Sequence, residues 1–288
     1  MRKKYEPAIA LENTKEVPLR AIMDAGFTSV MPKDERNPNF RKDVEEAKKL
    51  GFAIPYIHAS SNNIDQLWAE GAAKKKYISE TISTMKFCKD NDIKTMVMHP
   101  AFGDPAMKPN PPSVAGIKNF SELLKIAQDL GITIAFENVA NGIEHLEFLL
   151  DNMHLSDHDI SGLKFCWDTG HNRHYDKGID FMKKYGDRLG AVHISDTNAT
   201  WKPGQDHTFD FHLLPGDGDI DFEEVGTKIA KSSYTGPIML ETLKNSASDK
   251  VRKYDNMSVE RYLRRAYTKA KELSDFTTRK DEEVNNVN

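Results

Sequence analysis

The chain has 288 residues, a formal net charge of -4 and 29% charged residues, which describes an ordinary soluble, slightly acidic protein. It lacks the basic excess that proteins use to bind nucleic acids and other polyanions, so a nucleic-acid partner is not favoured. The start, MRKKYEPAIAL, has too short an apolar stretch for a signal peptide, and no run approaches the ~18 apolar residues of a membrane span, so we expect a cytoplasmic protein without a membrane partner.

Apolar runs and amphipathic stretches alternate along the first half of the chain. Four strands are predicted, at 5–11, 28–31, 52–58 and 95–99. The helices between them are predicted at 17–25, 38–49 and 71–89, and a glycine closes each of the first two. The proline-rich segment 100–113 after the fourth strand is too rigid to be helical, so it is a candidate wall of an active site.

The same alternation continues through the second half. Four more strands are predicted, at 132–138, 163–168, 189–195 and 237–241. Helices are predicted at 117–130, 143–150, 178–185, 222–231 and 258–273, and a polar connection occupies 196–221. The fifth strand, ITIAFEN, is apolar almost throughout, as expected for a parallel strand that is covered on both faces.

Eight strands that are each followed by a helix predict an α/β fold, a closed (β/α)8 TIM barrel, as a single domain over residues 1–274. A doubly wound open sheet would favour a glycine-rich phosphate turn after the first strand, and LENTKEVP contains no glycine. The polar segment 275–288 is expected to be a frayed tail. The two cysteines, Cys88 and Cys166, are expected to be buried thiols.

Six consecutive predicted strands end in a side chain that can bind a metal ion. Any one of them has an ordinary explanation, as a hydrogen-bonded core histidine or a solvated glutamate. Six such residues at the same structural position indicate a common role, because the carboxyl ends of barrel strands converge on one mouth and oxygen and nitrogen ligands gathered there bind divalent cations. The six residues are His58, His99, Glu137, Asp168, His193 and Glu241.

The segment FCWDTGH at 165–171 is the most informative of these strand ends. The apolar run stops at Asp168, Gly170 lets the backbone bend tightly, and His171 follows three residues after the carboxylate. Asp-Thr-Gly is equally typical of a turn or of the cap of a following helix, and that interpretation stays open.

Other histidines lie away from the strand ends. His145, His154 and His158 fall in the fifth helix and the turn after it and are predicted to be surface or packing residues, whereas His174 and His207 are loop residues with weak claims to a site. Asp210 and His212 are different, because two ligand-competent side chains at i and i+2 lie on one side of an extended segment. A polar loop with an incidental Asp and His is the alternative.

These motifs together resemble the xylose isomerase-like barrels, a family that includes sugar and sugar phosphate isomerases and epimerases and the AP endonucleases of the endonuclease IV type (AP endonuclease family 2). The resemblance covers most of the chain. Its specific parts are FEN at 136–138, WDTGH at 167–171, HISD at 193–196, FHLLPGDGDIDF at 211–222 and ET at 241–242.

The resemblance implies roles for particular residues. Glu137, Asp168, His193 and Glu241 fall on the ligands of a single divalent ion (Mn, Co, Mg or Zn), with no organic cofactor, and His171 falls on a substrate-side histidine. The two glutamates take the acid and base roles. His58, His99 and His212 would bind substrate, or with Asp210 would complete a site for further metal ions, as in the endonuclease branch.

The resemblance favours a metal-dependent isomerase or epimerase that moves a proton through a metal-stabilised enediolate of a small sugar, sugar phosphate or polyol. A dehydratase using the same site, an endonuclease IV-like phosphodiesterase with several zinc ions and a catalytically inactive sugar-binding barrel are the alternatives. Some epimerases of the family carry an arginine six residues after the strand-seven histidine, where this chain has Ala199. Arg173 or Lys202 would then supply the cation, and Phe102 or Trp201 an apolar wall. A homo-oligomer is compatible with the sequence.

Overall fold

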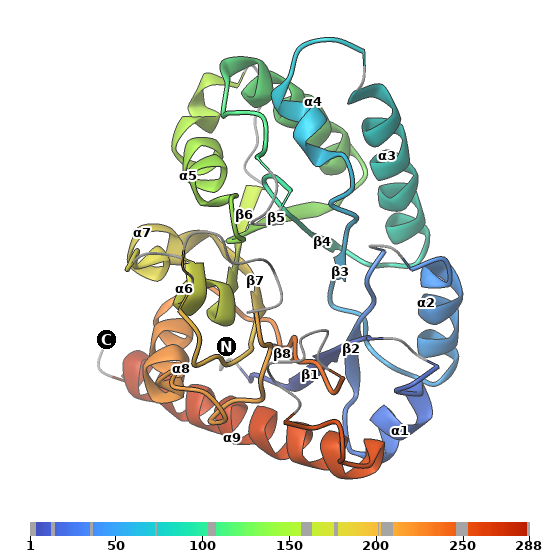
Figure 1. Cartoon of the computed structure of the whole chain (residues 1–288), viewed down its shortest axis with the longest axis vertical. Coiled ribbons are helices and arrows are strands. Elements are labelled where there is room, and N and C mark those ends of the chain that lie inside the picture. Colours follow the sequence, from blue (N-terminus) through green and yellow to red (C-terminus); the bar gives the residue numbers. More distant parts are fainter. Residues whose placement is uncertain are drawn as a thin grey trace.

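The computed structural model describes residues 4–12, 15–34, 37–72, 74–102, 108–156, 163–175, 178–200, 202, 210–245 and 253–286. Within them, parallel strands form a central barrel and helices surround it (Figure 1). The strands are β1 (Pro7–Ala10), β2 (Ser29–Met31), β3 (Ile57–His58), β4 (Thr95–Met98), β5 (Thr133–Glu137), β6 (Leu163–Asp168), β7 (Leu189–His193) and β8 (Ile238–Leu240).

The strand order confirms the predicted TIM barrel. One sheet has the order β2-β1-β8 and the other the order β3-β4-β5-β6-β7, and every strand pair is parallel. Isolated parallel bridges join the two sheets, between Ser29 and Ala53 at one seam and between Ile194 and Leu240 at the other. These bridges close the barrel, so all eight strand ends lie around one mouth.

The α-helices follow the predicted alternation with one addition. The α-helices are α1 (Leu19–Asp24), α2 (Phe40–Lys49), α3 (Lys74–Asp90), α4 (Val114–Asp129), α5 (Ile143–Asn152), α6 (Thr169–Tyr175), α7 (Phe181–Tyr185), α8 (Phe222–Lys231) and α9 (Val259–Asn286). Short 3-10 turns are η1 (Ile64–Trp68), η2 (Met153–Leu155) and η3 (Gly186–Arg188). The sequence did not predict α6 or these three 3-10 turns. No helix among the described residues combines the length and apolar character that crossing a bilayer requires.

One layer of buried side chains fills the barrel interior, and it determines where the mouth residues lie. Seven strands and Tyr56, which directly precedes β3, contribute to a cluster separate from the larger core between sheet and helices. Its members are Ala8, Ala10, Met31, Tyr56, Val97, Ala135, Cys166, Ala191 and Met239. Side chains two residues apart on a strand point to the same face. The residue two positions beyond the last member from each strand therefore points toward the barrel axis at the mouth. Cys166 lies in this layer and Cys88 in the outer core, and both are buried free thiols, as predicted.

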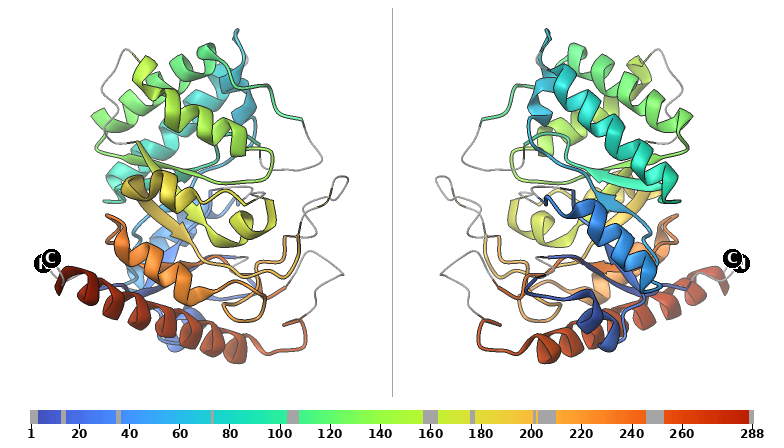
Figure 2. Two further views of the ribbon diagram at one scale, coloured as in Figure 1. Left: turned by 90° about the vertical axis from the view of Figure 1, so that its left-hand side faces the viewer. Right: turned by 90° about the vertical axis from the view of Figure 1, so that its right-hand side faces the viewer.

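The expectation of a frayed C-terminal tail is wrong up to Asn286. Helix α9 continues through these residues and runs along one edge of the molecule (Figure 2). Phe276 packs so closely on α8 that a Cβ placed on Gly226 would lie 2.7 Å from its ring. Thr277 and Asp281 are also buried, at 0% and 1% exposure. The polar composition of the segment concealed this one packed face.

Candidate metal centre

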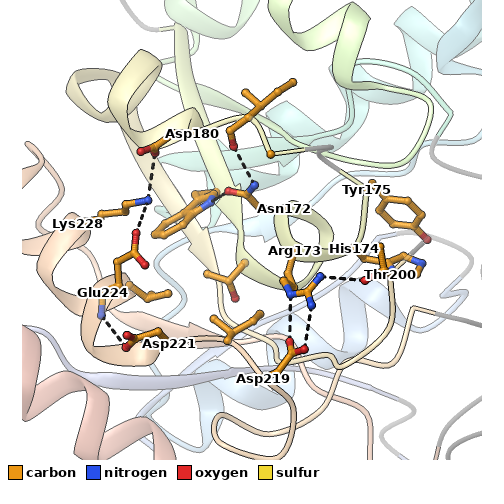
Figure 3. Close-up of a pocket in the computed structure, with 16 residues that line it drawn as sticks. Asn172, Arg173, His174, Tyr175, Asp180, Thr200, Asp219, Asp221, Glu224 and Lys228 are labelled. Atoms are coloured by element: carbon orange, nitrogen blue, oxygen red, sulfur yellow. Dashed lines mark hydrogen bonds and ion pairs between the residues drawn. The ribbon is translucent and has the colours of Figure 1, made fainter. Parts of the chain in front are cut away.

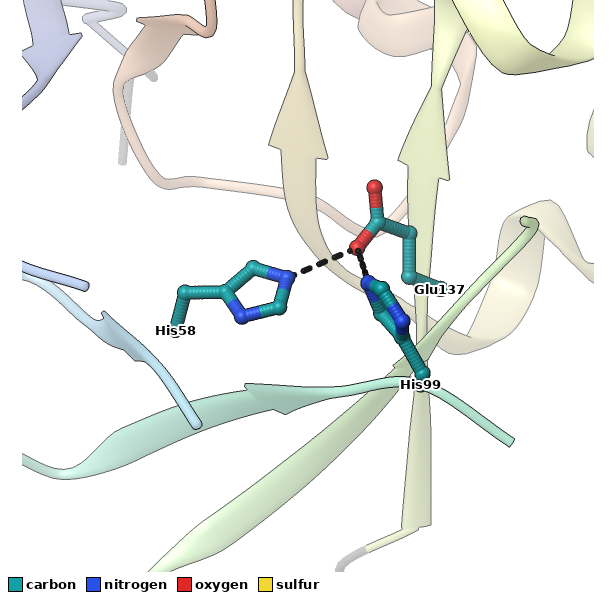
Figure 4. Close-up of side chains that lie close together, drawn as sticks. All are labelled: His58, His99 and Glu137. Atoms are coloured by element: carbon teal, nitrogen blue, oxygen red, sulfur yellow. Dashed lines mark hydrogen bonds and ion pairs between the residues drawn. The ribbon is translucent and has the colours of Figure 1, made fainter. Parts of the chain in front are cut away.

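The structure brings the six strand-end residues together around Glu137, which ends β5. Glu137 Oε2 lies 3.1 Å from His58 Nε2 and 3.4 Å from His99 Nε2, and Figure 4 shows both imidazoles directed at that oxygen. The other oxygen, Oε1, lies 2.9 Å from His193 Nδ1. Glu137 is 1% exposed, so a single buried carboxylate connects the ends of β3, β4 and β7.

Four of these residues form a compact group, which we call the primary group: Glu137, Asp168, His193 and Glu241. One ligand atom from each lies within 4.8 Å of the others, and all four residues are buried. His193 Nδ1 is at the middle of the group, 2.9 Å from Glu137, 2.8 Å from Glu241 Oε2 and 4.0 Å from Asp168 Oδ2.

The polypeptide around Asp168 explains how its carboxylate is held. Asn138 Oδ1 accepts from the Asp168 backbone N–H at 2.8 Å, and its Nδ2 donates to the Asp168 carbonyl at 2.9 Å. Asp168 Oδ1 accepts the backbone N–H of His171 at 2.7 Å, within the first turn of α6. A Cβ on Gly170 would lie 2.2 Å from Ser195 Oγ, so only glycine fits there. Asp168 thus caps a helix with one oxygen and faces the primary group with the other.

Burial and mutual repulsion give the carboxylates of the primary group very different proton affinities. Burial, together with the charges of Glu137 and Glu241, raises the pKa of Asp168 to about 7, although His171 opposes this. Burial also acts to raise the pKa of Glu137, but His193, His171 and His58 outweigh it and hold the pKa well below its ordinary value. For Glu241, His193 and Lys33 outweigh burial in the same way, so the pKa is again well below its ordinary value.

The donors of the primary group suit a divalent cation. Asp168 Oδ2 is buried and has no hydrogen-bond partner among the described residues, although a buried carboxylate oxygen normally has one. Three carboxylates and one imidazole are the mixed oxygen and nitrogen donor set that binds zinc, manganese or related ions. The primary group would therefore hold the ion. Asp168 Oδ2 would gain from the ion the interaction that it lacks among the described residues.

A second group, His171, Asp210 and His212, lies beside the first. Asp210 Oδ2 is 2.9 Å from His171 Nε2 and 3.1 Å from His212 Nε2. Burial acts to lower the pKa of His212, but Asp210 outweighs it and raises the pKa to about 9. His171 Nδ1 is 3.3 Å from Glu137 Oε1, so the histidine that the sequence placed on the substrate side joins the two groups.

Asp196, from the motif HISD, holds the loop that follows this second group. Its Oδ2 accepts the backbone N–H groups of Gly216 and Gly218 at 2.9 and 2.8 Å, and its Oδ1 accepts that of Ile220 at 3.1 Å. Antiparallel backbone hydrogen bonds also join Asp196 and Leu213. A Cβ on Gly218 would lie 2.3 Å from Asp196 Oδ1, which explains the second glycine of the segment PGDGD at 215–219. These bonds fix the chain just after Asp210 and His212.

The structure adds two mouth residues that the sequence analysis missed, Glu12 and Lys33. Lys33 Nζ donates to Glu241 Oε1. Glu12 Oε1 accepts the backbone N–H of Lys244 at 3.0 Å, and burial raises the pKa of Glu12 to about 7. A signal was available, because Glu12 and Lys33 follow Ala10 and Met31 of the interior layer by two residues, as His58 follows Tyr56.

The remaining candidates lie elsewhere. Arg173 forms a bidentate ion pair with Asp219, at 3.0 and 2.9 Å, and also donates to Thr200 Oγ1. These residues line a pocket of about 670 Å³ between α6 and α8 (Figure 3). Lys202 is exposed, and Phe102 packs partly buried on the outer core. Within the part of the chain that the structure describes, Arg173 is paired with Asp219 and Thr200 and not with the primary group.

The other predicted histidines have mixed outcomes. His145 packs on Trp68 with 5.0 Å between ring centroids, and His154 is exposed, so both are packing or surface residues as predicted. His174 is buried in α6 and is not a loop residue. The predictions for His158, Trp201 and His207 lie outside the described residues.

Comparisons with known proteins agree with this architecture. A family model described as xylose isomerase-like TIM barrel matches residues 19–260. The chain is 29% identical over 193 residues to the uncharacterized protein MJ1311 of Methanocaldococcus jannaschii. This match covers 64% of this chain and 63% of MJ1311, so it spans less than two thirds of the length of that protein. It is 24% identical over 262 residues to an inosose dehydratase of Clostridium botulinum, covering 82% of this chain and 84% of the relative.

Solved structures show the same fold at lower sequence identity. An L-ribulose 3-epimerase superposes with a TM-score of 0.70 at 15% identity, covering 97% of this chain and 98% of that chain. The IOLI protein with a binding zinc atom superposes with a TM-score of 0.66 at 16% identity, covering 95% and 98%. The inosose dehydratase and the L-ribulose 3-epimerase are enzymes by name.

Proposed function

The chain belongs to the xylose isomerase-like TIM barrel family, and from that premise we propose that it is a divalent-metal-dependent isomerase or epimerase of a small sugar, sugar phosphate or polyol. One observation carries the proposal: Glu137 and Glu241 approach the same ring nitrogen of His193, at 2.9 and 2.8 Å. Two carboxylates that meet at one point can remove a proton from one carbon or face of a substrate and return it to another.

Each residue of the primary group has a part in this reaction. One glutamate takes the proton from the carbon beside the carbonyl, and the other delivers a proton to the neighbouring carbon or the opposite face. When bound, a divalent cation supplies stabilisation of the negative charge on the substrate oxygens, by several kcal/mol. Glu137, Asp168, His193 and Glu241 would hold that cation. His58, His99, His171 and His212 surround the primary group and would hydrogen-bond the substrate.

A dehydratase is the nearest variant of this proposal. It begins with the same removal of a proton beside a carbonyl and then expels a hydroxyl group from the adjacent carbon as water. The inosose dehydratase of C. botulinum, which matches 82% of this chain, supports this variant. Both reactions need the same two glutamates.

A phosphodiesterase with several metal ions is the second candidate, and one observation favours it. His58 and His212 each direct Nδ1 at a backbone carbonyl, of Ala59 and Glu241, and Nε2 at a carboxylate. Histidines that bind metals commonly donate their other N–H to a carbonyl in this way. Against it, Glu137 Oε2 and Asp210 Oδ2, the oxygens that these histidines face, are already hydrogen-bonded, while one buried oxygen in each group, Asp168 Oδ2 and Asp210 Oδ1, has no such partner among the described residues. The net charge of -4 also disfavours a nucleic-acid substrate.

Metal content per chain separates the two candidates. We expect about one manganese, cobalt, magnesium or zinc ion per chain by elemental analysis after gentle dialysis, and no cleavage of abasic DNA. Asp168→Asn should remove this ion, whereas Asp187→Asn, an exposed control, should keep it. Close to three zinc ions per chain, together with cleavage of abasic DNA, would overturn the isomerase proposal.

A further inference from the structure

In each of the two glutamates of the primary group, one carboxylate oxygen faces His193 and the other faces different residues. Glu137 directs Oε1 at His193, and Glu241 directs Oε2 at His193. Their other oxygens face away from this nitrogen. Glu137 Oε2 lies against His58 and His99, from β3 and β4, and Glu241 Oε1 lies against Lys33, from the end of β2.

This division indicates where a substrate is placed. The two oxygens that face His193, Glu137 Oε1 and Glu241 Oε2, would bind the metal ion. The other two oxygens, Glu137 Oε2 and Glu241 Oε1, would then exchange a proton with the substrate. Those two oxygens face the half of the mouth formed by β2, β3 and β4. A substrate between Glu137 and Glu241 would therefore lie next to Lys33 on one side and next to His58 and His99 on the other.

The backbone holds Lys33 firmly at this position. Pro32 O accepts the backbone N–H of His58 at 3.0 Å, and His58 O accepts that of Asp34 at 2.8 Å, so Lys33 is fixed beside His58. Its side chain is 27% exposed. Its ammonium group donates a hydrogen bond to Glu241 Oε1.

Lys33 also brings a positive charge to the edge of the primary group. Among contacts between described residues, it is the only lysine or arginine that forms an ion pair with the primary group. Arg173 is engaged by Asp219 and Thr200, and position 199 is an alanine. The primary group contributes three carboxylates, so a fixed cation at its edge also offsets part of their charge.

We propose that Lys33 is a catalytic residue that binds the substrate oxygen on the carbon next to Glu241, an inference that rests on the proposed function. As the proton leaves carbon for a glutamate oxygen, its electron pair forms the carbon–carbon double bond and the carbonyl π pair moves onto oxygen. The Lys33 ammonium donates a charge-assisted hydrogen bond to the oxygen that gains this charge. The reverse movement on the other carbon or face restores the carbonyl, and Lys33 forms no covalent bond.

The test compares Lys33→Met, which removes the cation at similar length, with Lys33→Arg, which keeps it, and with the exposed control Lys94→Met. The readouts are manganese bound per chain, the melting temperature, and incorporation of deuterium into carbon positions of L-ribulose, D-tagatose and an inosose in D2O. Lys33→Met should bind manganese and melt as wild type does while its exchange rate falls by ~100-fold, the effect of losing one donor to a developing oxyanion. Lys33→Arg should recover part of that rate.

Two results would overturn the inference, and they differ from failure of the proposed function. Exchange by Lys33→Met at the wild-type rate would show that Lys33 does not touch the reacting oxygen. Loss of manganese by Lys33→Met, with no recovery in Lys33→Arg, would make Lys33 a support of Glu241 only. If wild-type protein exchanges no deuterium with any of the three sugars, the proposed function fails, and the role of Lys33 fails with it.

Discussion

Replacing Glu137 or Glu241 by glutamine should reduce turnover of the sugar substrate by at least ~100-fold, the effect of losing a general base. Glutamine keeps the size of the side chain and one potential ligand oxygen, but it cannot accept the proton. The hydrogen bonds that glutamine can retain, with His58 at position 137 and with Lys33 at position 241, should keep the barrel folded.

The measurement is the steady-state rate of sugar interconversion, with the unfolding transition recorded for each variant. Glu122→Gln, on the exposed face of α4, is the matched control and should turn over as wild type does. If Glu137→Gln or Glu241→Gln isomerises its substrate at near the wild-type rate, that residue is only structural and the two-carboxylate reaction is wrong.

The substitution Asp168→Asn should leave the metal-free protein at least as stable as wild type, but it should make the metal-loaded protein less stable than wild type. Without metal, burial beside Glu137 and Glu241 raises the pKa of Asp168 to about 7, whereas an unfolded aspartate titrates near 3.8. The protonated form is therefore favoured in the folded state. Its contribution to stability is complete below pH 3.8 and is lost as the pH rises through about 7. At pH 8 the metal-free variant should be at least as stable as wild type.

With manganese the order should invert. A ligand at a hundredfold excess over its Kd stabilises the folded state by about 2.7 kcal/mol, and Asp168→Asn should lose most of this increment. Urea unfolding at pH 8, with manganese and with a chelator, measures the difference, and Asp187→Asn should gain the same increment as wild type. Equal stabilisation of Asp168→Asn and wild type by manganese would remove Asp168 from the metal site.

The arrangement of the mouth was largely predictable because one local rule repeats. An apolar strand that stops at a polar residue marks the carboxyl end of a barrel strand, and Glu137, Asp168 and His193 are the last residues of β5, β6 and β7. The same rule reaches Lys33 through its spacing from Met31, but lysine is not a metal ligand when protonated and was not selected. Its role becomes apparent only from its contact with Glu241, which closure of the barrel creates.

Three differences from prediction have physical causes that lie outside the local pattern. Pro55 cannot donate a ladder hydrogen bond, so the apolar run 52–58 forms only the two-residue strand Ile57–His58. Helix α6 forms at Thr169 and Gly170, two weak helix formers, because Asp168 caps it and Gly170 packs on Ser195. The end of α9 is stabilised by contact with α8, a partner from a distant part of the chain.

Deuterium incorporation is the most direct test of the central claim that this site moves a proton at carbon. Manganese-loaded protein should be incubated in D2O with L-ribulose, D-tagatose and an inosose, and carbon-bound deuterium followed by NMR. We expect exchange at a carbon next to the carbonyl of at least one of these sugars, abolished by Glu137→Gln and by chelator. Absence of exchange in all three, from protein that carries close to three zinc ions and cleaves abasic DNA, would contradict the proposal and assign the site to phosphodiester hydrolysis.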